Sequence, residues 1–450
     1  MMTSTTDLIR KYDVAVPRYT SYPTVPLWEN NVGELTWKRT VQKAYRNFGN
    51  YEGINLYLHL PYCESLCTYC GCNKRITKNH DTEKPYIQAI IKEWEHYLKV
   101  LPEKPKIAGI HLGGGTPTFF SPENLFEMLN YIIHSAEVLP EAEMSFEGHP
   151  NNTTFEHLVT LRLLGFNRVS YGIQDFDENV QKAIHRVQPF ETVKKATDNA
   201  RLVGYEAINF DLIYGLPHQT VDSIKSTFKQ VASLQPERIA FYSYAHVPSV
   251  FPAQKSFEQY LPQKEGKRIL YEAGKILLQE MGYEEIGMDH FALKEDPLLQ
   301  AKIAGKLHRN FMGYTTQASK MLIGLGSSAI SDIYYAYAQN TKDIELYKEQ
   351  LALDHFPLSK GHLMSIEDIK TRKTILELIC NGRTKLVDTI WDMKTIHQMS
   401  EMQNDGLLTL TNGTIKVTDM GMAFIRNICA IFDHRMKNQE AKKFVFSKAI

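Results

Sequence analysis

The amino-acid sequence predicts an α/β protein, with a partial barrel of six β–α units, an N-terminal arm and a mainly helical C-terminal domain. Between about residues 49 and 295, short β-rich runs alternate with amphipathic stretches. The β-rich runs are almost continuously apolar, which is typical of parallel strands covered by helices. A closed barrel needs eight such units, and the sequence contains six, so we expect a partial (β/α)6 barrel.

The predicted strands share a high content of β-branched and aromatic residues, which is the usual composition of a strand. In chain order they span 55–60, 107–114, 143–148, 168–174, 207–215 and 238–247.

Helices are predicted between these strands. In segment 83–101, apolar residues recur at helical spacing, so that Ile90 and Trp94 share one face with their neighbours. Segment 121–139 begins with Ser121 as an N-cap and Pro122 at the first helical position. Four later segments complete the alternation, and glycine closes two of them: 154–165, 177–187, 191–204 and 220–234.

The regions on either side of the predicted barrel have a different pattern. Residues 1–48 form an arm that contains the stretch "VPRYTSYPT". After about residue 295 the β–α alternation stops, and we expect 296–360 to be a connecting segment of loops and a short strand at the active site. Residues 361–450 read as helices around one hairpin, whose turn is formed by Asn412 and Gly413.

Composition excludes several function classes. Lysine plus arginine equals aspartate plus glutamate at 51 each, so nothing indicates a general affinity for nucleic acid or anionic membranes. The N-terminus has no apolar run and carries Asp7, and no stretch approaches the roughly 18 apolar residues of a membrane span. We therefore expect a cytoplasmic protein with reduced thiols, in which Cys380 and Cys429 are buried core residues.

The other four cysteines lie within ten residues, at Cys63, Cys67, Cys70 and Cys72. They follow the first predicted strand, at the edge of the sheet where reactive groups collect in parallel β/α proteins. The spacing suits thiolates that wrap an iron–sulfur cubane, one thiolate for each iron. Zinc is the first alternative, although its sites usually combine two separated cysteine pairs, and solvated or redox-active thiols are the second.

The first three cysteines carry a resemblance. If three thiolates hold a [4Fe-4S] cluster, one iron stays open and can chelate S-adenosylmethionine for reductive cleavage to a 5′-deoxyadenosyl radical. The pattern C-x3-C-x2-C on the first β–α loop resembles the radical S-adenosylmethionine superfamily. The stretch "GGGTPT" at 113–118 is similar to that superfamily's glycine-rich segment, which contacts the methionine amino group, and glycine permits the close backbone approach.

Motifs along the whole chain resemble one family, the oxygen-independent coproporphyrinogen III oxidases, or coproporphyrinogen dehydrogenases. They are "PRYTSYPT", "CGCNK", "GIQDF", "NFDLIYGLPHQT", "YAHVP", "GMDHFA", "LHRNF", "GYTTQ" and "RNICAIFD". The resemblance implies oxidative decarboxylation of two propionates of coproporphyrinogen III to vinyls, which gives protoporphyrinogen IX in haem biosynthesis. It also implies two S-adenosylmethionine molecules and an electron donor such as a flavodoxin-type protein, and we expect a monomer.

The resemblance implies roles for individual residues. Cluster ligands match Cys63, Cys67 and Cys70. Contacts to the first S-adenosylmethionine match Tyr57, Gly114, Glu147 and Ile330. Contacts to the second match Tyr69, Gly115, Thr116, Gln174, Arg186, Asp211 and Ala245.

The chemistry of several matched residues agrees with these roles. Glu147 can accept hydrogen bonds from an ammonium, and Arg186 can pair with a carboxylate. Asp211 lies in an apolar strand, where an unpaired carboxylate is costly. Without the resemblance, Arg186 is typical of an exposed helical arginine. Cys72 is left without an iron to bind, and it is either a catalytic thiol near the substrate or a small buried side chain.

The sequence indicates the residues that bind the substrate less clearly. Its propionates need cations, and Arg18, Lys74 and Arg75 are the candidates in this sequence. The arm that carries Arg18 and Tyr19 either covers the open mouth of the barrel or packs statically on it.

Three departures from the family pattern concern the substrate. The sequence has "EGHPN" with His149 and Asn151, "NFMGYT" with Met312, and "FYSYAHVP" where the family has an acidic motif, a glutamine and an asparagine. They leave open a related radical enzyme that modifies haem, or a haem-binding chaperone without turnover. The arm and Cys72 argue against the chaperone, whose relatives lack both.

Overall fold

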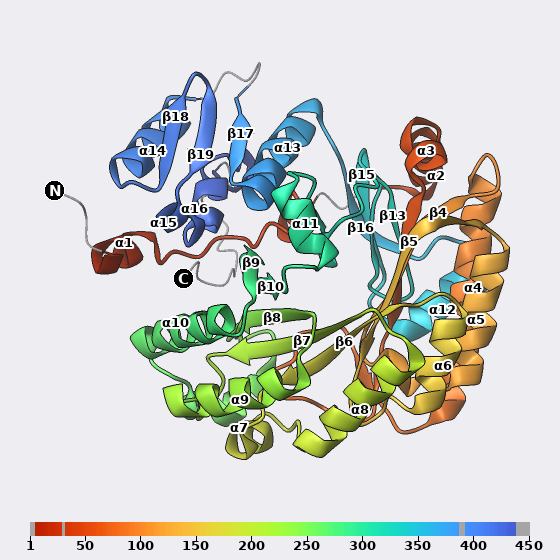
Figure 1. The fold of residues 1–450 in the computed structure, drawn as a ribbon. Helices are drawn as coiled ribbons and strands as arrows, with labels where there is room; N and C mark the ends of the chain where they lie inside the picture. Colours follow the sequence, from red (N-terminus) through yellow and green to blue (C-terminus); the bar gives the residue numbers. More distant parts are fainter. Residues whose placement is uncertain (1–4, 29–31, 387–391, 438–450) are drawn as a thin grey trace.

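Six neighbouring parallel strands form the centre of a twelve-stranded sheet (Figure 1). The computed structural model describes residues 5–28, 32–386 and 392–437. The six strands lie side by side in chain order, and each pairs in parallel with the next. They are β1 (Ile54–Leu60), β4 (Lys106–Gly114), β5 (Glu137–Gly148), β6 (Arg168–Gln174), β7 (Ala207–Tyr214) and β8 (Arg238–Ser243). The predicted partial barrel is confirmed.

Helices cover the outer face of these strands (Figure 1). In α4 (Glu83–Val100), Ile87, Ile90 and Trp94 are completely buried in the main core. The predicted N-cap of α5 (Pro122–His134) is present, because Ser121 Oγ accepts a hydrogen bond from the Asn124 amide at 3.2 Å. The remaining helices of this layer are α6 (Phe155–Leu163), α7 (Glu178–Ala183), α8 (Phe190–Val203), α9 (Val221–Leu234) and α10 (Lys264–Glu280).

The sheet extends beyond the predicted strands at both edges. Strand β13 (Leu322–Leu325) pairs in parallel with β1, and β14 (Ile330–Asp332), β15 (Ala336–Asn340) and β16 (Leu358–Leu363) continue it in antiparallel pairs. At the other edge, β10 (His290–Ala292) and β9 (Glu284–Gly287) pair antiparallel with β8. Segment 296–360 is thus richer in structure than the expected loops and single strand. It also contains α11 (Pro297–Ile303), α12 (Ile344–Ala352) and the hairpin of β11 (His308–Asn310) and β12 (Gly313–Thr315).

The predicted arm has two parts with different partners. Helix α1 (Thr5–Tyr12) lies beside the C-terminal region, where Tyr12 donates from its hydroxyl to Asp405 at 2.6 Å (Figure 1). Helix α2 (Glu34–Ala44) instead belongs to the barrel, because Trp37 and Val41 are fully buried in the main core.

The C-terminal region packs around a second core. Its hairpin joins β18 (Leu408–Thr411) and β19 (Thr414–Val417), and Asn412 and Gly413 both have positive φ, as the predicted turn requires. The predicted burial of Cys380 and Cys429 is confirmed, at 4% and 0% exposed. The other elements are α13 (Ile366–Asn381), β17 (Arg383–Lys385), α14 (Met393–Asn404), α15 (Asp419–Met422), α16 (Ile425–Ala430) and α17 (His434–Lys437).

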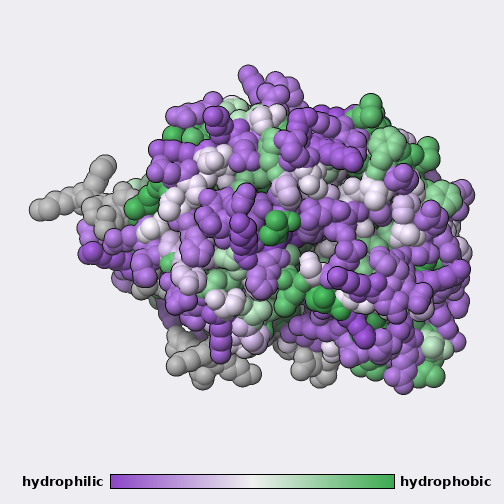
Figure 2. All heavy atoms as spheres, turned by 90° about the horizontal axis from the view of Figure 1, so that it is seen from below, coloured by the Kyte–Doolittle hydropathy of each residue, from purple (hydrophilic) through white to green (hydrophobic). Residues whose placement is uncertain are grey.

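Figure 2 shows the hydropathy of one face of the molecule. Seen from below the view of Figure 1, this face is mainly hydrophilic, with small separate hydrophobic areas. No helix within the described ranges combines the length and the apolar character that crossing a bilayer demands.

We predict that Trp37→Ala lowers the free energy of unfolding by about 3–5 kcal/mol, because it removes a fully buried side chain from the main core. The indole also donates to Tyr97 on α4 at 3.2 Å. Urea denaturation followed by circular dichroism measures the change. The matched control is Leu35→Ala on the same helix, where the side chain is 62% exposed and the expected change is below about 0.5 kcal/mol. Equal losses in both variants would contradict the assignment of α2 to the barrel.

Candidate active site

The cysteine-bearing segment is a closed loop at the carboxyl end of β1. It leaves through β2 (Tyr62–Cys63) and returns through β3 (Arg75–Ile76), which pairs in parallel with β2. The Arg75 amide donates to the Pro61 carbonyl at 2.8 Å, and the Thr77 amide donates to the Cys63 carbonyl at 2.9 Å. The four cysteines are therefore held between two fixed ends of the loop.

Hydrogen-bond donors surround the cysteine sulfurs. Thr116 Oγ1 donates to Cys63 Sγ, and Arg186 Nη1 donates to Cys67 Sγ, both at 3.4 Å. Lys74 adds a positive charge on the loop, where its Nζ donates to the Cys70 carbonyl at 2.9 Å. Hydroxyl, guanidinium and ammonium groups stabilise thiolates, which are the form of cysteine that binds iron.

The donor set fits the cluster that the spacing predicts. Cys63, Cys67 and Cys70 supply three sulfurs from one loop, each close to a group that stabilises a thiolate.

Cys72 is exposed and lies against Cys70. A hydrogen bond between the two thiols lowers the pKa of Cys70 and raises the pKa of Cys72. The exposure of Cys72 favours the catalytic thiol over the small buried side chain.

The glycine-rich segment joins the end of β4 to the cysteine loop. The Gly115 amide donates to the Leu60 carbonyl at 2.8 Å, and the Thr116 amide donates to the Tyr62 carbonyl at 2.9 Å. A Cβ atom at Gly115 would lie 2.7 Å from the Pro61 carbonyl carbon, and Gly114 has a φ of +113°. The glycines are thus required by the chain's own close packing, in addition to any approach of a ligand.

Glu147 lies at the carboxyl end of β5 and faces the interior of the barrel. Its Oε2 accepts from the Gly114 amide at 3.2 Å, and its Oε1 is 3.7 Å from His111 Nε2. Burial alone would raise the pKa of Glu147, but the contacts with His111 and Gly114 lower it overall. The His111 ring stacks on Tyr57 of β1 with centroids 6.1 Å apart. The structure therefore brings Tyr57, Gly114 and Glu147 together, as the resemblance implies.

Asp211 lies on β7 in a small polar network. It accepts from Ser170 Oγ at 3.0 Å and from Asn209 Nδ2 at 2.9 Å. Burial, and then the negative charge of Glu147, raise the pKa of Asp211 to about 6. Two carboxylates therefore act on one another across the interior, and a cationic ligand placed between them would stabilise both.

Arg186 links the cysteine loop to the end of β6. It lies outside α7, and its guanidinium donates to the Gly172 carbonyl at 2.6 Å as well as to Cys67. The interpretation as an exposed helical arginine is wrong. Gln174 is close by, since a Cβ atom at Gly172 would lie 2.6 Å from Gln174 Nε2 and 2.9 Å from Arg186 Nη2.

Three other predicted residues are placed around this group. The Ile330 carbonyl packs against Gly324, whose partner on β1 is Tyr57. Gln254 Nε2 donates to the Tyr69 carbonyl at 3.1 Å and to the Ala245 carbonyl at 3.3 Å. Ala245 lies two residues beyond the end of β8, so its predicted place within the strand is wrong. Gln254, 1% exposed, was missed because nothing in the sequence separates it from surface glutamines.

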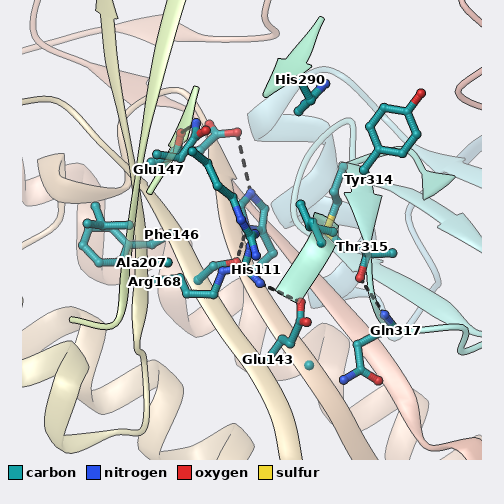
Figure 3. Close-up of a pocket in the computed structure, with 18 of the residues that line it drawn as sticks. His111, Glu143, Phe146, Glu147, Arg168, Ala207, His290, Tyr314, Thr315 and Gln317 are labelled. Atoms are coloured by element: carbon teal, nitrogen blue, oxygen red, sulfur yellow. Dashed lines mark hydrogen bonds and ion pairs between the residues drawn. The ribbon is translucent and has the colours of Figure 1, made fainter. Parts of the chain in front are cut away.

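A cavity of about 180 Å³ occupies the barrel interior below these groups (Figure 3). Glu147, Asp211 and Met312 line it, whereas the cysteines do not. Sequence reasoning missed the polar residues that line the rest of the wall. One sequence pattern could have identified some of them, namely polar residues at every second position of a strand, which face the same side. Ser145 precedes Glu147 by two residues in this way, and Asn209 precedes Asp211. The missed residues include His111, Ser145, Ser170, Asn209, Tyr242, His290 and Tyr314.

The candidates for substrate binding separate into two groups. Arg75 is a surface residue paired with Glu345 at 3.0 Å, and Lys74 is engaged on the cysteine loop. Arg18 alone points toward the barrel, where it forms an ion pair with Asp289 and its Cζ lies 5.8 Å from the centre of the Tyr242 ring. Its neighbour Tyr19 is 2% exposed, so this part of the arm is packed against the rest of the chain.

His149, one of the departures, lies beside the predicted site. Its Nδ1 accepts from the Asn151 amide at 3.2 Å, so its Nε2 carries the proton in the neutral ring. Burial, and then the charge of Arg186, lower the pKa of His149 to about 3. His149 is therefore neutral at physiological pH, where the family pattern has an acidic residue.

Comparison with known proteins agrees with this geometry. Residues 57–231 match the model of the radical SAM superfamily. The chain is 35% identical to an oxygen-independent coproporphyrinogen III oxidase of Synechocystis, over 99% of this chain and 97% of that protein. It is 36% identical to the Escherichia coli protein of the same name, over 98% of both chains.

A solved structure supports the same relationship. Coproporphyrinogen III oxidase from Escherichia coli, described as a radical SAM enzyme, superimposes with a TM-score of 0.89 at 34% identity. The match covers 96% of this chain and 99% of that chain. The protein therefore belongs to the oxygen-independent coproporphyrinogen III oxidase family, within the radical SAM superfamily.

Proposed function

We propose that this protein catalyses the oxygen-independent oxidative decarboxylation of two propionates of coproporphyrinogen III to vinyls, which yields protoporphyrinogen IX. The observation that carries the proposal is the full-length relationship, since the oxidases of Synechocystis and Escherichia coli align over 97% and 98% of their own length. The arm, the cysteine loop and the C-terminal region are all included. The haem-modifying and chaperone alternatives have no comparable support.

Cys63, Cys67 and Cys70 are the proposed ligands of the [4Fe-4S] cluster. When bound, such a cluster supplies the electron that cleaves S-adenosylmethionine to methionine and a 5′-deoxyadenosyl radical. The protein's part is to hold the thiolates and to keep the loop closed. Thr116 and Arg186 support it through their contacts with Cys63 and Cys67.

Two sites for S-adenosylmethionine are proposed, one that contains Glu147 and one that contains Asp211. This ligand carries an ammonium and a sulfonium, and the two carboxylates provide the negative charge that attracts such a cation. The first site would use Tyr57, Gly114, Glu147 and Ile330. The second would use Tyr69, Gly115, Thr116, Gln174, Arg186, Asp211 and Ala245.

Further parts of the proposal concern partners and location. The reaction needs electrons from outside the chain, and a flavodoxin-type protein is the proposed donor. Reduced thiols on an exposed loop suit the cytoplasm, where we propose that the protein acts as a monomer.

We predict that anaerobic incubation with S-adenosylmethionine, a reductant and coproporphyrinogen III gives a product with two carboxylates fewer, together with 5′-deoxyadenosine. Mass spectrometry of the porphyrin and chromatography of the nucleoside check both products. Omission of S-adenosylmethionine is the control and should leave the substrate intact. If 5′-deoxyadenosine forms while coproporphyrinogen III is recovered unchanged, the substrate is different and the haem-modifying alternative gains support.

We predict about four iron and four sulfide per chain after anaerobic reconstitution, because three thiolates suffice to hold a cubane. Serine at Cys63, Cys67 or Cys70 should abolish this content, whereas Cys380→Ala, in the second core, should retain it. Cys72→Ser should retain the iron and the change that S-adenosylmethionine causes in the electron paramagnetic resonance spectrum, yet lower turnover. If Cys72→Ser loses iron as completely as Cys67→Ser, all four cysteines are ligands. The proposal that one iron stays open to S-adenosylmethionine would then be wrong. Stoichiometric zinc without iron would refute the cluster itself.

A further inference from the structure

Four basic side chains gather beside the arm, where it passes the carboxyl ends of β7 and β8. Lys267 of α10 donates from Nζ to the Tyr244 carbonyl at 2.7 Å, and its Nζ lies 6.0 Å from the centre of the Tyr214 ring. Arg18 of the arm reaches the neighbouring ring of Tyr242. The other two members of this cationic cluster are Arg309 of β11 and Arg426 of α16.

Two members of the cationic cluster hold the backbone of the arm. Arg426 donates from Nε to the Pro17 carbonyl at 3.2 Å and also donates to the Val16 carbonyl. Arg309 donates from Nη1 to the Arg18 carbonyl at 3.1 Å. The backbone that carries Arg18 is therefore held by two arginines from other parts of the chain.

Two members of the cationic cluster form no ion pair within the described part of the chain. Arg18 pairs with Asp289, but neither Lys267 nor Arg309 forms an ion pair with any residue that the structure describes. Burial, and then the charges of Arg18 and Arg426, lower the pKa of Lys267 to about 8, although the Asp13 carboxylate acts in the opposite direction. Burial, and then Arg18, lower the pKa of Arg426 to about 10. These cations repel one another, and an anion among them would relieve the repulsion.

The cationic cluster borders the wall of the interior cavity. The Arg309 guanidinium carbon lies 5.1 Å from the centre of the Tyr314 ring, and Tyr314 and Tyr242 both line the cavity. Figure 3 shows Tyr314 and His290 on the other side of this cavity from Glu147. The basic groups thus lie across from the carboxylates proposed to bind S-adenosylmethionine.

Two polar atoms in this wall have no partner of their own. Arg309 Nε and the Tyr314 hydroxyl are buried without a hydrogen-bond partner among the residues for which coordinates are described. Arg309 Nε is a donor, so what it needs is an acceptor such as a carboxylate oxygen. The Tyr314 hydroxyl can donate or accept, and it lies against Gly287 of β9.

We propose that Arg18 and Lys267 bind propionate carboxylates of the substrate, while Arg309 and Arg426 hold the arm so that the Arg18 side chain is in place. This inference rests on the proposed function for the identity of the substrate. The side chain of Arg18 is 32% exposed and its guanidinium can form two parallel hydrogen bonds to a carboxylate. Lys267 uses one ammonium hydrogen on Tyr244 and has two others to donate. Anchoring one side of the macrocycle here would turn its opposite side toward Glu147 and Asp211.

The test compares the charged substrate with a neutral version of the same macrocycle. Affinities for coproporphyrinogen III and for its tetramethyl ester are measured anaerobically by titration calorimetry with the reconstituted protein. Arg18→Gln and Lys267→Gln should each weaken binding of the tetracarboxylate roughly 10- to 100-fold, the range of one lost charge-assisted hydrogen bond. Binding of the ester should not change. Arg18→Lys should recover part of the loss, because it keeps the charge and loses the planar fork.

The matched control is Arg162→Gln, which removes an arginine from the outer helix α6 and should leave both affinities unchanged. Melting temperatures identify any variant that has lost its fold, and Lys267→Gln is informative even if Arg18→Gln unfolds the arm. Wild-type affinity for coproporphyrinogen III in both glutamine variants would overturn the inference.

Failure of this inference and failure of the proposed reaction give different results. If the wild-type protein binds coproporphyrinogen III in this charge-dependent way but releases no vinyl product, the site stands and the proposed reaction fails. If the wild-type protein makes the product and both variants bind the substrate normally, the reaction stands and this inference fails.

Discussion

Backbone hydrogen bonds at the carboxyl end of β1 hold the candidate site together. The chain leaves the strand at Pro61, and within two residues it is bonded to Gly115, Thr116 and Arg75. These bonds tie the cysteine loop to the adjacent strand β4, whose neighbour β5 carries Glu147. Because parallel strands end at one rim, groups that are distant in sequence converge there. A change that moves this junction would displace the cysteines and the carboxylates together.

Groups of opposite charge lie on two sides of the cavity beside that rim, and the basic ones, Arg18 and Lys267, stand behind its tyrosine lining. Glu147 and Asp211 lie on strands at the centre of the sheet, whereas Arg18 and Lys267 come from the arm and the last helix of the barrel layer. A cationic nucleotide and an anionic macrocycle would be drawn to different walls of one space. Electrostatics alone would then orient the two ligands relative to one another.

The sequence predicted the parts of the fold that long, uniform patterns encode. The six apolar strands and their capped helices are each recognisable locally, and the cysteine spacing identifies a cluster loop without tertiary information. Strands β14 to β16 were missed because runs of three to six residues gain their pairing from distant partners. Arg186 was misread without the family resemblance, since its partners Gly172 and Cys67 are 14 and 119 residues away. Lys267 carried no signal at all, and Arg309 was noted only as part of the motif "LHRNF", because the significance of both depends on which charges lie near them in the folded chain.

The attachment of the arm to the C-terminal region affects the order in which the chain becomes functional. Tyr12 is bonded to Asp405 and Asn427, and the backbone at Pro17 is bonded to Arg426. During synthesis on the ribosome, residues 12–18 therefore emerge long before residues 405–427, to which they dock. The barrel can assemble earlier from contacts within its own sequence, but Arg18 reaches its place only after Arg426 has been synthesised. The proposed propionate site thus forms later than the strands that surround the cavity.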